Sequence, residues 1–363
     1  MQILFLNSIG KKKWGGGEKW MLMAAAGLAA KRHTVLIGCA PNSIIEKNAL
    51  SKGLKTVNLS FSSDFDLLGF FRLKHIIQKH KISHIICGQN KDSKIASIAA
   101  LQLKGVSVIA RHGLQLIQKK WKYKFIFSNL LDGIITNSNT IKTEYDSYNW
   151  FSKDFVKVIY NGFNSPKNVE PHNLIKTFSL PENAITLFSA GRLAKQKGFE
   201  ILINAAEIAA KNNQSWYFII AGKGKLEKKL KRMVRAKKLE DRIFFIGFID
   251  DVLPYVKAAD LFVLPSYYEG MPNAVMEAMG MGKCCVVTSV NGNNELITHM
   301  KEGILVEPGN SHQLYKAIKH AADDENLRNT IGNEAFIKIN TLFSEDRMIE
   351  ELEEFLQTKT QLI

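Results

Sequence analysis

The chain has neither the long apolar runs nor the cysteine spacing that would indicate a membrane span or a zinc site. No hydrophobic stretch reaches the roughly 18 residues that a membrane-spanning helix needs. Near the N-terminus the lysines follow the apolar residues, the reverse of a signal peptide, so we interpret this stretch as a buried first strand. The four cysteines lie in or beside apolar strand-like runs, which predicts reduced core residues of a cytoplasmic protein: Cys39, Cys87, Cys284 and Cys285.

Acidic residues are scarce in only one half of the chain. Residues 1–167 contain 25 Lys and Arg but 9 Asp and Glu, whereas residues 168–363 contain 24 and 25. The net charge of +15 therefore arises in the N-terminal half. Such asymmetry indicates an anionic partner for that half. Nucleic acid, a lipid surface and a phosphorylated acceptor all fit, and charge alone does not choose among them.

The length and the order of the expected elements indicate two domains. A chain of 363 residues can form two domains with separate cores. In both halves, short β-rich runs that are apolar throughout alternate with helical stretches, which is typical of a doubly wound parallel sheet. Residues 161–173 have the turn residues of a linker. We therefore predict an α/β protein with Rossmann-like domains at 1–163 and 164–345, which bind ligands at the carboxyl ends of their strands.

Three successive glycines stand between the first expected strand and the first long helix. Gly15, Gly16 and Gly17 have no Cβ, so a ligand phosphate can approach their backbone closely. We expect the helix to begin near Glu18 and to point backbone N–H groups toward the same space. The segment is not a dinucleotide fingerprint, because it lacks the G-x-G-x-x-G pattern and a fitting acidic residue after the second strand. A plain flexible turn explains these glycines equally well.

Two cations occupy a strand-to-helix loop in the second half. Arg192 follows an expected strand end, and Lys197 comes just before the Gly198 turn that opens a helix. A guanidinium fork and a lysine point charge at such a loop suit a diphosphate. The alternative is that both are solvated surface charges.

Two glutamates eight residues apart flank another helix start. Pro272 suits the first turn of this helix, and the free N–H groups near Asn273 and Ala274 would form an anion site. Glu269 reaches the same place from the loop, while Glu277 lies about one turn into the helix. A helix cap or a buried acid would explain one of these glutamates but explains both poorly.

With these motifs in order, the chain resembles a known enzyme family. Glu269 and Glu277 fit the E-x7-E motif of the GT-B-fold retaining glycosyltransferases of glycosyltransferase family 4. Matching segments run along nearly the whole chain: GGGEKW, ARHG, VIYNGFN, SAGRLAKQKGFE, AGKGKLEKKL, IFFIGF, EGMPNAVMEAMGMGK, NGNNELI and FSEDRMIEELEEFL. The first motif is usually Gly-Gly-Ala-Glu, so Gly17 is a departure, but one that should still permit a phosphate to approach.

The resemblance implies both a fold and a reaction. The expected fold is GT-B, in which two Rossmann-like domains face a central cleft and a C-terminal helix, here 346–363, packs back on the N-terminal domain. The expected reaction moves a sugar from a nucleotide-diphosphate sugar, with UDP as the expected nucleotide, to an acceptor hydroxyl with retention at the anomeric carbon. The sequence leaves open whether Glu269 is a nucleophile or the acceptor enters on the same face with the leaving phosphate as base.

The resemblance also assigns roles to individual residues. Arg192 and Lys197 would bind the donor diphosphate, Glu277 the ribose and Glu269 the transferred sugar. The rest of the donor site would consist of an elbow that holds sugar hydroxyls and two residues against the base: Gly270, Met271, Pro272, Asn273 and Ala274, then Gly247 and Phe248.

His112 ends an expected strand of the first domain, in the segment ARHG. A lone histidine is more often structural, but the family often has one here that contacts the donor sugar. The resemblance therefore makes His112 a candidate catalytic residue. Arg111 beside it would contact phosphate or acceptor.

Asp64 and Asp66 form a D-x-D triplet, which glycosyltransferases of another fold use to hold a divalent metal. Here the triplet lies in a loop before a helical stretch, where aspartates commonly cap the helix. The cations and the helix N-terminus described above already supply the positive charge that a metal would provide. We expect no metal and no cofactor, the nucleotide sugar being a substrate.

Residues 115–131 mix lysines with aromatic residues, directly after His112. Basic-aromatic helices of this kind can lie on anionic membranes. The alternative is a partly buried helix with solvated lysines. Together with the basic half, the segment predicts a peripheral protein on the inner face of the cytoplasmic membrane, with a sugar or lipid-linked acceptor, such as a lipopolysaccharide precursor.

Two other functions are compatible with parts of the sequence. A nucleic-acid-binding protein would explain the basic half but not the motifs of the second, and the chain has no recognition motif of known type. A sugar-nucleotide epimerase-like GT-B enzyme is the other alternative, and the E-x7-E segment argues against it. We expect no nucleic-acid partner.

Overall fold

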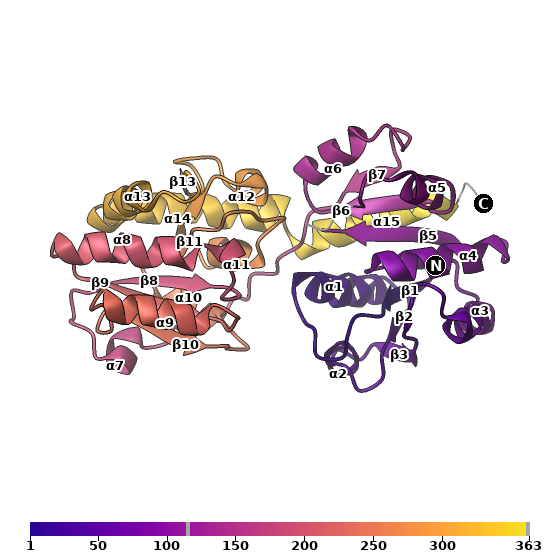
Figure 1. The fold of residues 1–363 in the computed structure, drawn as a ribbon, viewed down its shortest axis with the longest axis horizontal. Coiled ribbons are helices and arrows are strands. Elements are labelled where there is room, and N and C mark those ends of the chain that lie inside the picture. Colours follow the sequence, from indigo (N-terminus) through magenta and orange to yellow (C-terminus); the bar gives the residue numbers. More distant parts are fainter. Residues whose placement is uncertain (114–116, 361–363) are drawn as a thin grey trace. The chain divides into compact units, whose positions relative to one another are not determined.

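The computed structural model describes residues 1–113 and 117–360, which form two compact units (Figure 1). Unit 1 consists of Met1–Gly162 together with Glu345–Ile363, and unit 2 consists of Phe163–Ser344. Each unit has its own parallel sheet with helices between successive strands. The prediction of two doubly wound parallel-sheet domains is therefore confirmed.

Unit 1 contains a seven-stranded parallel sheet in the order β3-β2-β1-β4-β5-β6-β7. Its strands are β1 (Gln2–Asn7), β2 (Thr34–Cys39), β3 (Lys55–Asn58), β4 (His84–Cys87), β5 (Ser107–His112), β6 (Gly133–Thr136) and β7 (Val156–Val158). Its helices are α1 (Gly16–Ala30), α2 (Ile44–Ser51), α3 (Leu67–His80), α4 (Asn90–Leu101), α5 (Trp121–Asn129), α6 (Asn139–Asp146) and α15 (Glu345–Thr360). Helix α1 begins at Gly16, close to the predicted start near Glu18, with Gly15 as its N-cap residue and Gly16 and Gly17 in its first turn.

The two faces of this sheet enter separate cores. Along β1, Ile3 and Phe5 join a core with α1, α2 and α15, while Leu4 and Leu6 join one with α3, α4 and α6. Alternate residues of a strand point to opposite faces, which is why a strand covered on both sides is apolar throughout. Helix α15 lies beside α1 (Figure 1), and a Cβ on Gly27 would fall within 2.0 Å of an Ile349 side-chain carbon, so this approach requires glycine.

Unit 2 contains a six-stranded parallel sheet in the order β10-β9-β8-β11-β12-β13. Its strands are β8 (Ile185–Ala190), β9 (Trp216–Ala221), β10 (Ile243–Gly247), β11 (Leu261–Leu264), β12 (Cys284–Thr288) and β13 (Ile304–Val306). Its helices are α7 (Leu174–Phe178), η1 (Lys195–Lys197), α8 (Phe199–Lys211), α9 (Glu227–Ala236), α10 (Leu253–Ala258), α11 (Asn273–Gly280), α12 (Asn291–Leu296), α13 (Ser311–Asp323) and α14 (Glu325–Leu342). The short strand β13 was not predicted from the sequence.

Both sheets reverse their winding direction between two central strands. In unit 1 the chain winds outward from β1 to β3 on one side and from β4 to β7 on the other, and in unit 2 the reversal lies between β8 and β11. The strands at each reversal pair in parallel, with Phe5 opposite Ile86 and Leu187 opposite Leu261. Loops that leave such a switch point diverge and open a crevice at the carboxyl ends of the strands. Ligand-binding groups are therefore expected after β1, β4, β8 and β11.

The four cysteines lie on β2, β4 and β12, and all of them are buried and outside disulfides. Burial raises the pKa of the Cys39 thiol to about 11, so this residue is an unreactive core thiol, as predicted. Within residues 1–113 and 117–360, no helix combines the length and the apolar character needed to cross a bilayer.

Candidate functional site

The loop after β8 carries two of the predicted cations. Arg192 is exposed in this loop, and Lys197 closes the short 3-10 helix η1. Gly198 follows with φ of +63°, and a Cβ there would lie 2.0 Å from Pro265 O. Glycine alone combines this left-handed backbone with so close an approach. At this turn the loop after β8 therefore packs directly against the loop after β11.

Lys197 Nζ lies 2.5 Å from Glu269 Oε1, in an ion pair that joins these two loops. The Ser266 hydroxyl donates a second hydrogen bond to the same oxygen at 2.6 Å. Glu269 is only 4% exposed, and a buried carboxylate is costly unless its charge is paired and its oxygens accept hydrogen bonds. Its other oxygen, Oε2, faces Gln196 Nε2 at 3.5 Å, too far for a strong hydrogen bond. Oε2 is therefore the oxygen that can accept from a ligand.

Hydrogen bonds from the end of β12 and the start of α12 stabilise the elbow between β11 and α11. Thr288 Oγ1 donates to Ser266 O at 2.5 Å, and Gly292 N donates to Glu269 O at 3.3 Å. A Cβ on Gly292 would lie 1.9 Å from Gly270 O, so the backbones touch. No motif in the sequence indicated a role for Ser266 or Thr288. The one signal for them is that each is a small polar residue at a strand end.

Helix α11 runs over Asn273–Gly280, the residues predicted for it. Pro272 is its N-cap residue, not a first-turn residue, and its side chain has no polar atom with which to cap the helix. Asn273 and Ala274 begin the helix half-buried, and the partial positive charge of a helix N-terminus lies there. Glu277 lies half-buried in the same helix.

A row of close backbone contacts joins the ends of β8, β9 and β10. A Cβ on Gly222 would lie 1.9 Å from Gly191 O, and Gly222 N donates to Gly247 O at 2.6 Å. Gly247 has φ of +74°, and the Phe248 side chain that follows is 60% exposed. The aromatic ring predicted to lie against a base is thus on the same edge of the sheet as the loop after β8.

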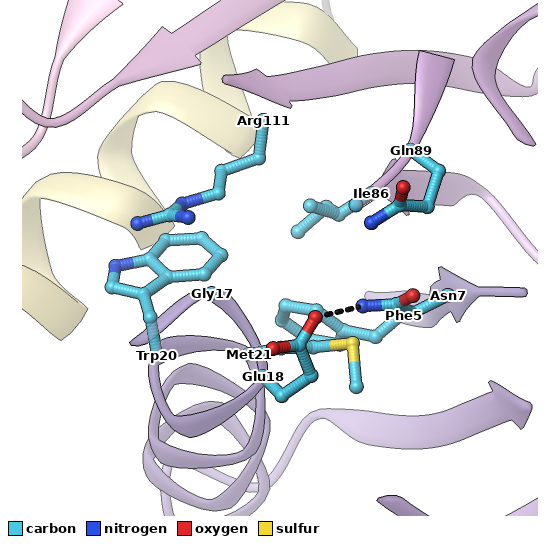
Figure 2. A pocket seen from close by; sticks show the side chains of 10 residues that line it. Phe5, Asn7, Gly17, Glu18, Trp20, Met21, Ile86, Gln89 and Arg111 are labelled. Atoms are coloured by element: carbon cyan, nitrogen blue, oxygen red, sulfur yellow. Dashed lines mark hydrogen bonds between the residues drawn. The ribbon is translucent and has the colours of Figure 1, made fainter. Parts of the chain in front are cut away.

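Unit 1 has a cavity of about 110 Å³ at its own switch point, between the ends of β1 and β4 (Figure 2). Asn7 Nδ2 donates to the buried Glu18 Oε1 at 3.2 Å, and the Gln89 amide faces the cavity from the other side. The guanidinium of Arg111 lies over the Trp20 ring, with Cζ 4.6 Å from the ring centroid. These residues place a carboxylate, two amides, a cation and an aromatic ring around one small space. Among these residues, Arg111 alone had a role predicted from the sequence.

Burial lowers the pKa of Arg111 to about 10, an effect that Glu18 opposes, so the guanidinium stays charged at neutral pH. Its Nη2 donates to Asn161 Oδ1 at 3.1 Å. The glycines at the start of α1 lie next to these charged groups. A Cβ on Gly17 would be 3.5 Å from Arg111 Nη1, and one on Gly15 would be 3.4 Å from a Glu18 oxygen. Both are ordinary contact distances, so the alanine common in the resembling motif would fit at Gly17.

His112 ends β5 with 4% of its surface exposed. The Tyr145 hydroxyl accepts a hydrogen bond from Ile117 N at 3.1 Å and lies 2.8 Å from His112 Nδ1. We infer that the tyrosine donates its proton to Nδ1, which leaves the imidazole proton on Nε2. Burial, together with the charge of Arg111, lowers the pKa of His112 to about 3, so the ring is neutral at pH 7. Nε2 is buried and has no hydrogen-bond partner within residues 1–113 and 117–360.

Both aspartates of the D-x-D triplet have protein partners. Asp66 is the N-cap residue of α3, where Oδ1 accepts from Gly69 N at 2.8 Å, so the cap interpretation is confirmed for it. Hydrogen bonds from Ser62 and Gly69 hold the pKa of Asp66 below its usual range. Asp64 pairs with Lys94 at 2.5 Å.

The basic-aromatic segment 115–131 forms helix α5 over Trp121–Asn129, and its residues 115 and 116 lie outside the described ranges. Phe127 is fully buried in a core of unit 1, whereas Trp121 and Phe125 are exposed. The helix is thus partly buried and also presents aromatic rings to solvent. This arrangement combines features of both interpretations of the segment.

Family models match both units of the chain. The model described as glycosyl transferases group 1 matches residues 172–337, and the model described as Glycosyltransferase Family 4 matches residues 14–165.

Two curated relatives and one solved structure are also similar. An uncharacterized glycosyltransferase of Methanocaldococcus jannaschii is 32% identical over 60% of this chain and 58% of its own length. The UDP-Gal:α-D-GlcNAc-diphosphoundecaprenol α-1,3-galactosyltransferase of Escherichia coli is 34% identical over 44% of this chain and 43% of its own. The chain thus spans about half the length of these relatives. The structure of Anabaena Alr3699/HepE in complex with UDP and glucose has a TM-score of 0.84 and 22% identity, and covers 99% of this chain and 100% of its own.

Proposed function

Because this chain belongs to glycosyltransferase family 4, we propose that it transfers a sugar from a UDP-sugar to an acceptor hydroxyl with retention at the anomeric carbon. The observation that carries the proposal is the joining of Lys197 and Glu269 beside the N-terminus of α11, at the switch point of unit 2. These groups combine positive charge for a diphosphate with a hydrogen-bond acceptor for sugar hydroxyls. UDP is the proposed nucleotide because the Anabaena structure is a complex with UDP and glucose and the E. coli relative's name contains UDP-Gal.

In the proposed reaction the acceptor oxygen bonds to the anomeric carbon on the face that the leaving group vacates. The bond from that carbon to the β-phosphate oxygen breaks, and the acceptor proton passes to the departing phosphate. Lys197, Arg192 and the N–H groups at the start of α11 stabilise the charge that develops on that phosphate. No metal is needed for this step, because these groups supply the positive charge.

Glu269 has a positioning part in this scheme. Its Oε1 is occupied by Lys197 and Ser266, which fixes the carboxylate, and Oε2 accepts from a hydroxyl of the transferred sugar. His112 Nε2 donates a hydrogen bond to a second hydroxyl of that sugar in this scheme. Glu277 accepts hydrogen bonds from the ribose diol, and the base stacks on Phe248. None of these contacts requires a cofactor.

We further propose that the acceptor is carried on a lipid diphosphate and that the basic unit 1 works at an anionic membrane surface. The E. coli relative's name specifies a diphosphoundecaprenol-linked sugar as its acceptor. Unit 1 carries the positive charge that such a diphosphate and an acidic bilayer would attract. In this scheme the protein contributes to a cell-envelope glycan and does not bind nucleic acid.

Thermal denaturation with a panel of UDP, GDP, ADP and their sugars tests the donor. A UDP-sugar at about 100 times its Kd should stabilise the fold by about 2.7 kcal/mol and raise the melting temperature by a few degrees. Addition of EDTA should change neither this shift nor the rate of transfer, and NMR of the product should show the donor's anomeric configuration. The proposal would be contradicted if no UDP compound raised the melting temperature. It would also be contradicted if the product had the opposite anomeric configuration to the donor. If EDTA abolished transfer and manganese restored it, only the proposal that the step needs no metal would be refuted.

Replacement of Tyr145 by phenylalanine tests the tautomer of His112. The variant removes the donor to Nδ1, so the imidazole proton is free to move there and Nε2 ceases to be a reliable donor. We expect kcat to fall by about tenfold, the scale of one hydrogen bond, with little change in KM. Tyr148→Phe is the matched control, because its hydroxyl donates to Ile117 O at 2.9 Å and has no contact with His112. Equal losses in both variants would show a merely structural role for Tyr145.

A further inference from the structure

Large apolar side chains are exposed on helices α3 and α5 of unit 1 and in the turn that precedes α3. We call them the α3–α5 surface, which consists of Phe65, Leu67, Leu68 and Phe71 at the start of α3 and of Trp121 and Phe125 on α5. Phe65 is 90% exposed, Trp121 84% and Leu68 79%. Exposed apolar groups that gather in this way are unusual on a soluble face and mark sites that meet another apolar body.

The turn that carries Phe65 is held in one conformation. Asp66 caps α3 and also accepts from Ser62 N at 2.8 Å and from the Ser62 hydroxyl at 2.9 Å, which closes the turn 62–66. A Cβ on Gly69 would lie 2.6 Å from the Phe61 ring, so the first turn of α3 packs tightly on the buried Phe61. A turn fixed in this way cannot fold Phe65 back into the protein. It presents the ring to solvent.

Lys94 of α4 joins the two ends of this surface. Its Nζ is 2.5 Å from Asp64 Oδ2 in the turn and 5.4 Å from the centroid of the Tyr123 ring on α5. One helical turn later, Ile98 is exposed on the same face of α4. Helices α3, α4 and α5 lie at one end of unit 1 in Figure 1, in agreement with these contacts. These contacts therefore connect the turn before α3 to α5 by way of α4.

The charge around this face is strongly positive. Residues 59–131 contain 12 Lys and Arg but only 3 acidic residues. Each of the three is engaged: Asp64 pairs with Lys94, Asp66 caps α3, and the buried Asp92 accepts from Ser8 N at 2.9 Å. The lysines that precede and follow Trp121, Lys119, Lys120 and Lys124, are exposed. The surface thus has exposed apolar side chains with cations beside them, and its three acidic residues are engaged within the protein.

We propose that the α3–α5 surface inserts its apolar side chains into the outer layer of an acidic bilayer, with Phe65 and Leu68 at its centre. The occupant is a lipid surface because aromatic and leucine side chains beside lysines match the acyl chains and the anionic headgroups together. Nucleic acid would use the cations but leave the exposed leucines in water. This inference rests on the proposed lipid-linked acceptor, and it adds that binding is partly hydrophobic and therefore partly resistant to salt.

Co-sedimentation with phosphatidylcholine vesicles, with and without phosphatidylglycerol, tests the insertion. The full chain should bind the acidic vesicles and should keep a bound fraction in high salt, where screening weakens the lysine contacts. The double variant Phe65→Ser/Leu68→Ser should lower the partition coefficient at least about tenfold and abolish the salt-resistant fraction, because transfer of each large apolar side chain is worth a tenfold change or more. Replacing Lys119, Lys120 and Lys124 by glutamine should instead remove the salt-sensitive part.

The matched control is Leu50→Ser/Phe336→Ser, which removes two exposed apolar side chains that are not part of this surface, on α2 and α14, and should bind as the wild type does. A Phe65→Trp variant should show an added emission that brominated acyl chains quench, and Leu50→Trp should not. Wild-type binding by the Phe65→Ser/Leu68→Ser variant, or equal binding of the full chain to neutral and acidic vesicles, would overturn the proposal. So would salt-sensitive duplex binding without vesicle binding. Transfer to a small soluble acceptor is measured in parallel: its absence in the wild type counts against the proposed function, whereas loss of vesicle binding with transfer intact counts against the insertion alone.

Discussion

Lys197→Ala is expected to lower kcat/KM for transfer from a UDP-sugar by about 100- to 1000-fold, the scale seen when a preorganised charge at a developing anion is removed. Lys197 lies between the loops after β8 and β11 and is the cation in direct contact with Glu269. The same substitution also leaves a buried carboxylate without its cation, which costs about 3–5 kcal/mol of folding stability. The structure therefore predicts a lower melting temperature as well as a lower rate.

A second variant separates these two effects. Lys197→Ala combined with Glu269→Gln removes the unpaired charge, so it should recover most of the melting temperature while transfer stays slow. Lys195→Ala is the matched control, because it removes an exposed lysine from the same 3-10 helix and should leave the rate within about twofold. Because Glu269→Gln alone is expected to slow transfer, the rate of the double variant does not report on Lys197. A melting temperature that stays low in the double variant would show that the unpaired charge is not the cause of the lost stability.

The parallel sheets and the local motifs could be predicted because they depend on short-range patterns. Runs such as β4 and β11 are buried at every residue, and a strand buried on both faces reads as a continuous apolar stretch. The α11 elbow is equally local, since Pro272 and the helix after it adjoin in sequence.

Contacts between distant segments could not be predicted. Lys197 and Glu269 are 72 positions apart, and they meet because the sheet places β8 beside β11. Both were expected to face the donor separately, and nothing in the sequence indicated that they would pair with each other. Likewise, Tyr145 reaches His112 from α6, 33 positions away, and this contact decides the tautomer. Patterns of single residues indicate which groups are available, whereas the topology decides which of them touch.

Glu269→Gln should lower kcat by about 100-fold while the KM for the donor stays unchanged or falls. Glutamine keeps the volume of glutamate, and its oxygen still accepts from Ser266 and Lys197, so the elbow should stay folded. In the wild type, the negative charge of Glu269 repels the donor diphosphate. Its removal therefore should not weaken binding of the donor in the ground state. What is lost is the strong acceptor for a sugar hydroxyl as positive charge builds at the anomeric carbon.

Glu277→Ala, in helix α11 after the elbow, provides the contrast. Ribose contacts act equally in the ground state and the transition state, so this variant should raise the donor KM by about tenfold and leave kcat within about threefold. Steady-state kinetics with varied donor at saturating acceptor measure both constants. The opposite division of effects between Glu269 and Glu277 would mean that the ribose and sugar roles are exchanged. Small and equal effects would remove both glutamates from the donor site, and the pairing of Glu269 with Lys197 would then be a structural link between the loops after β8 and β11.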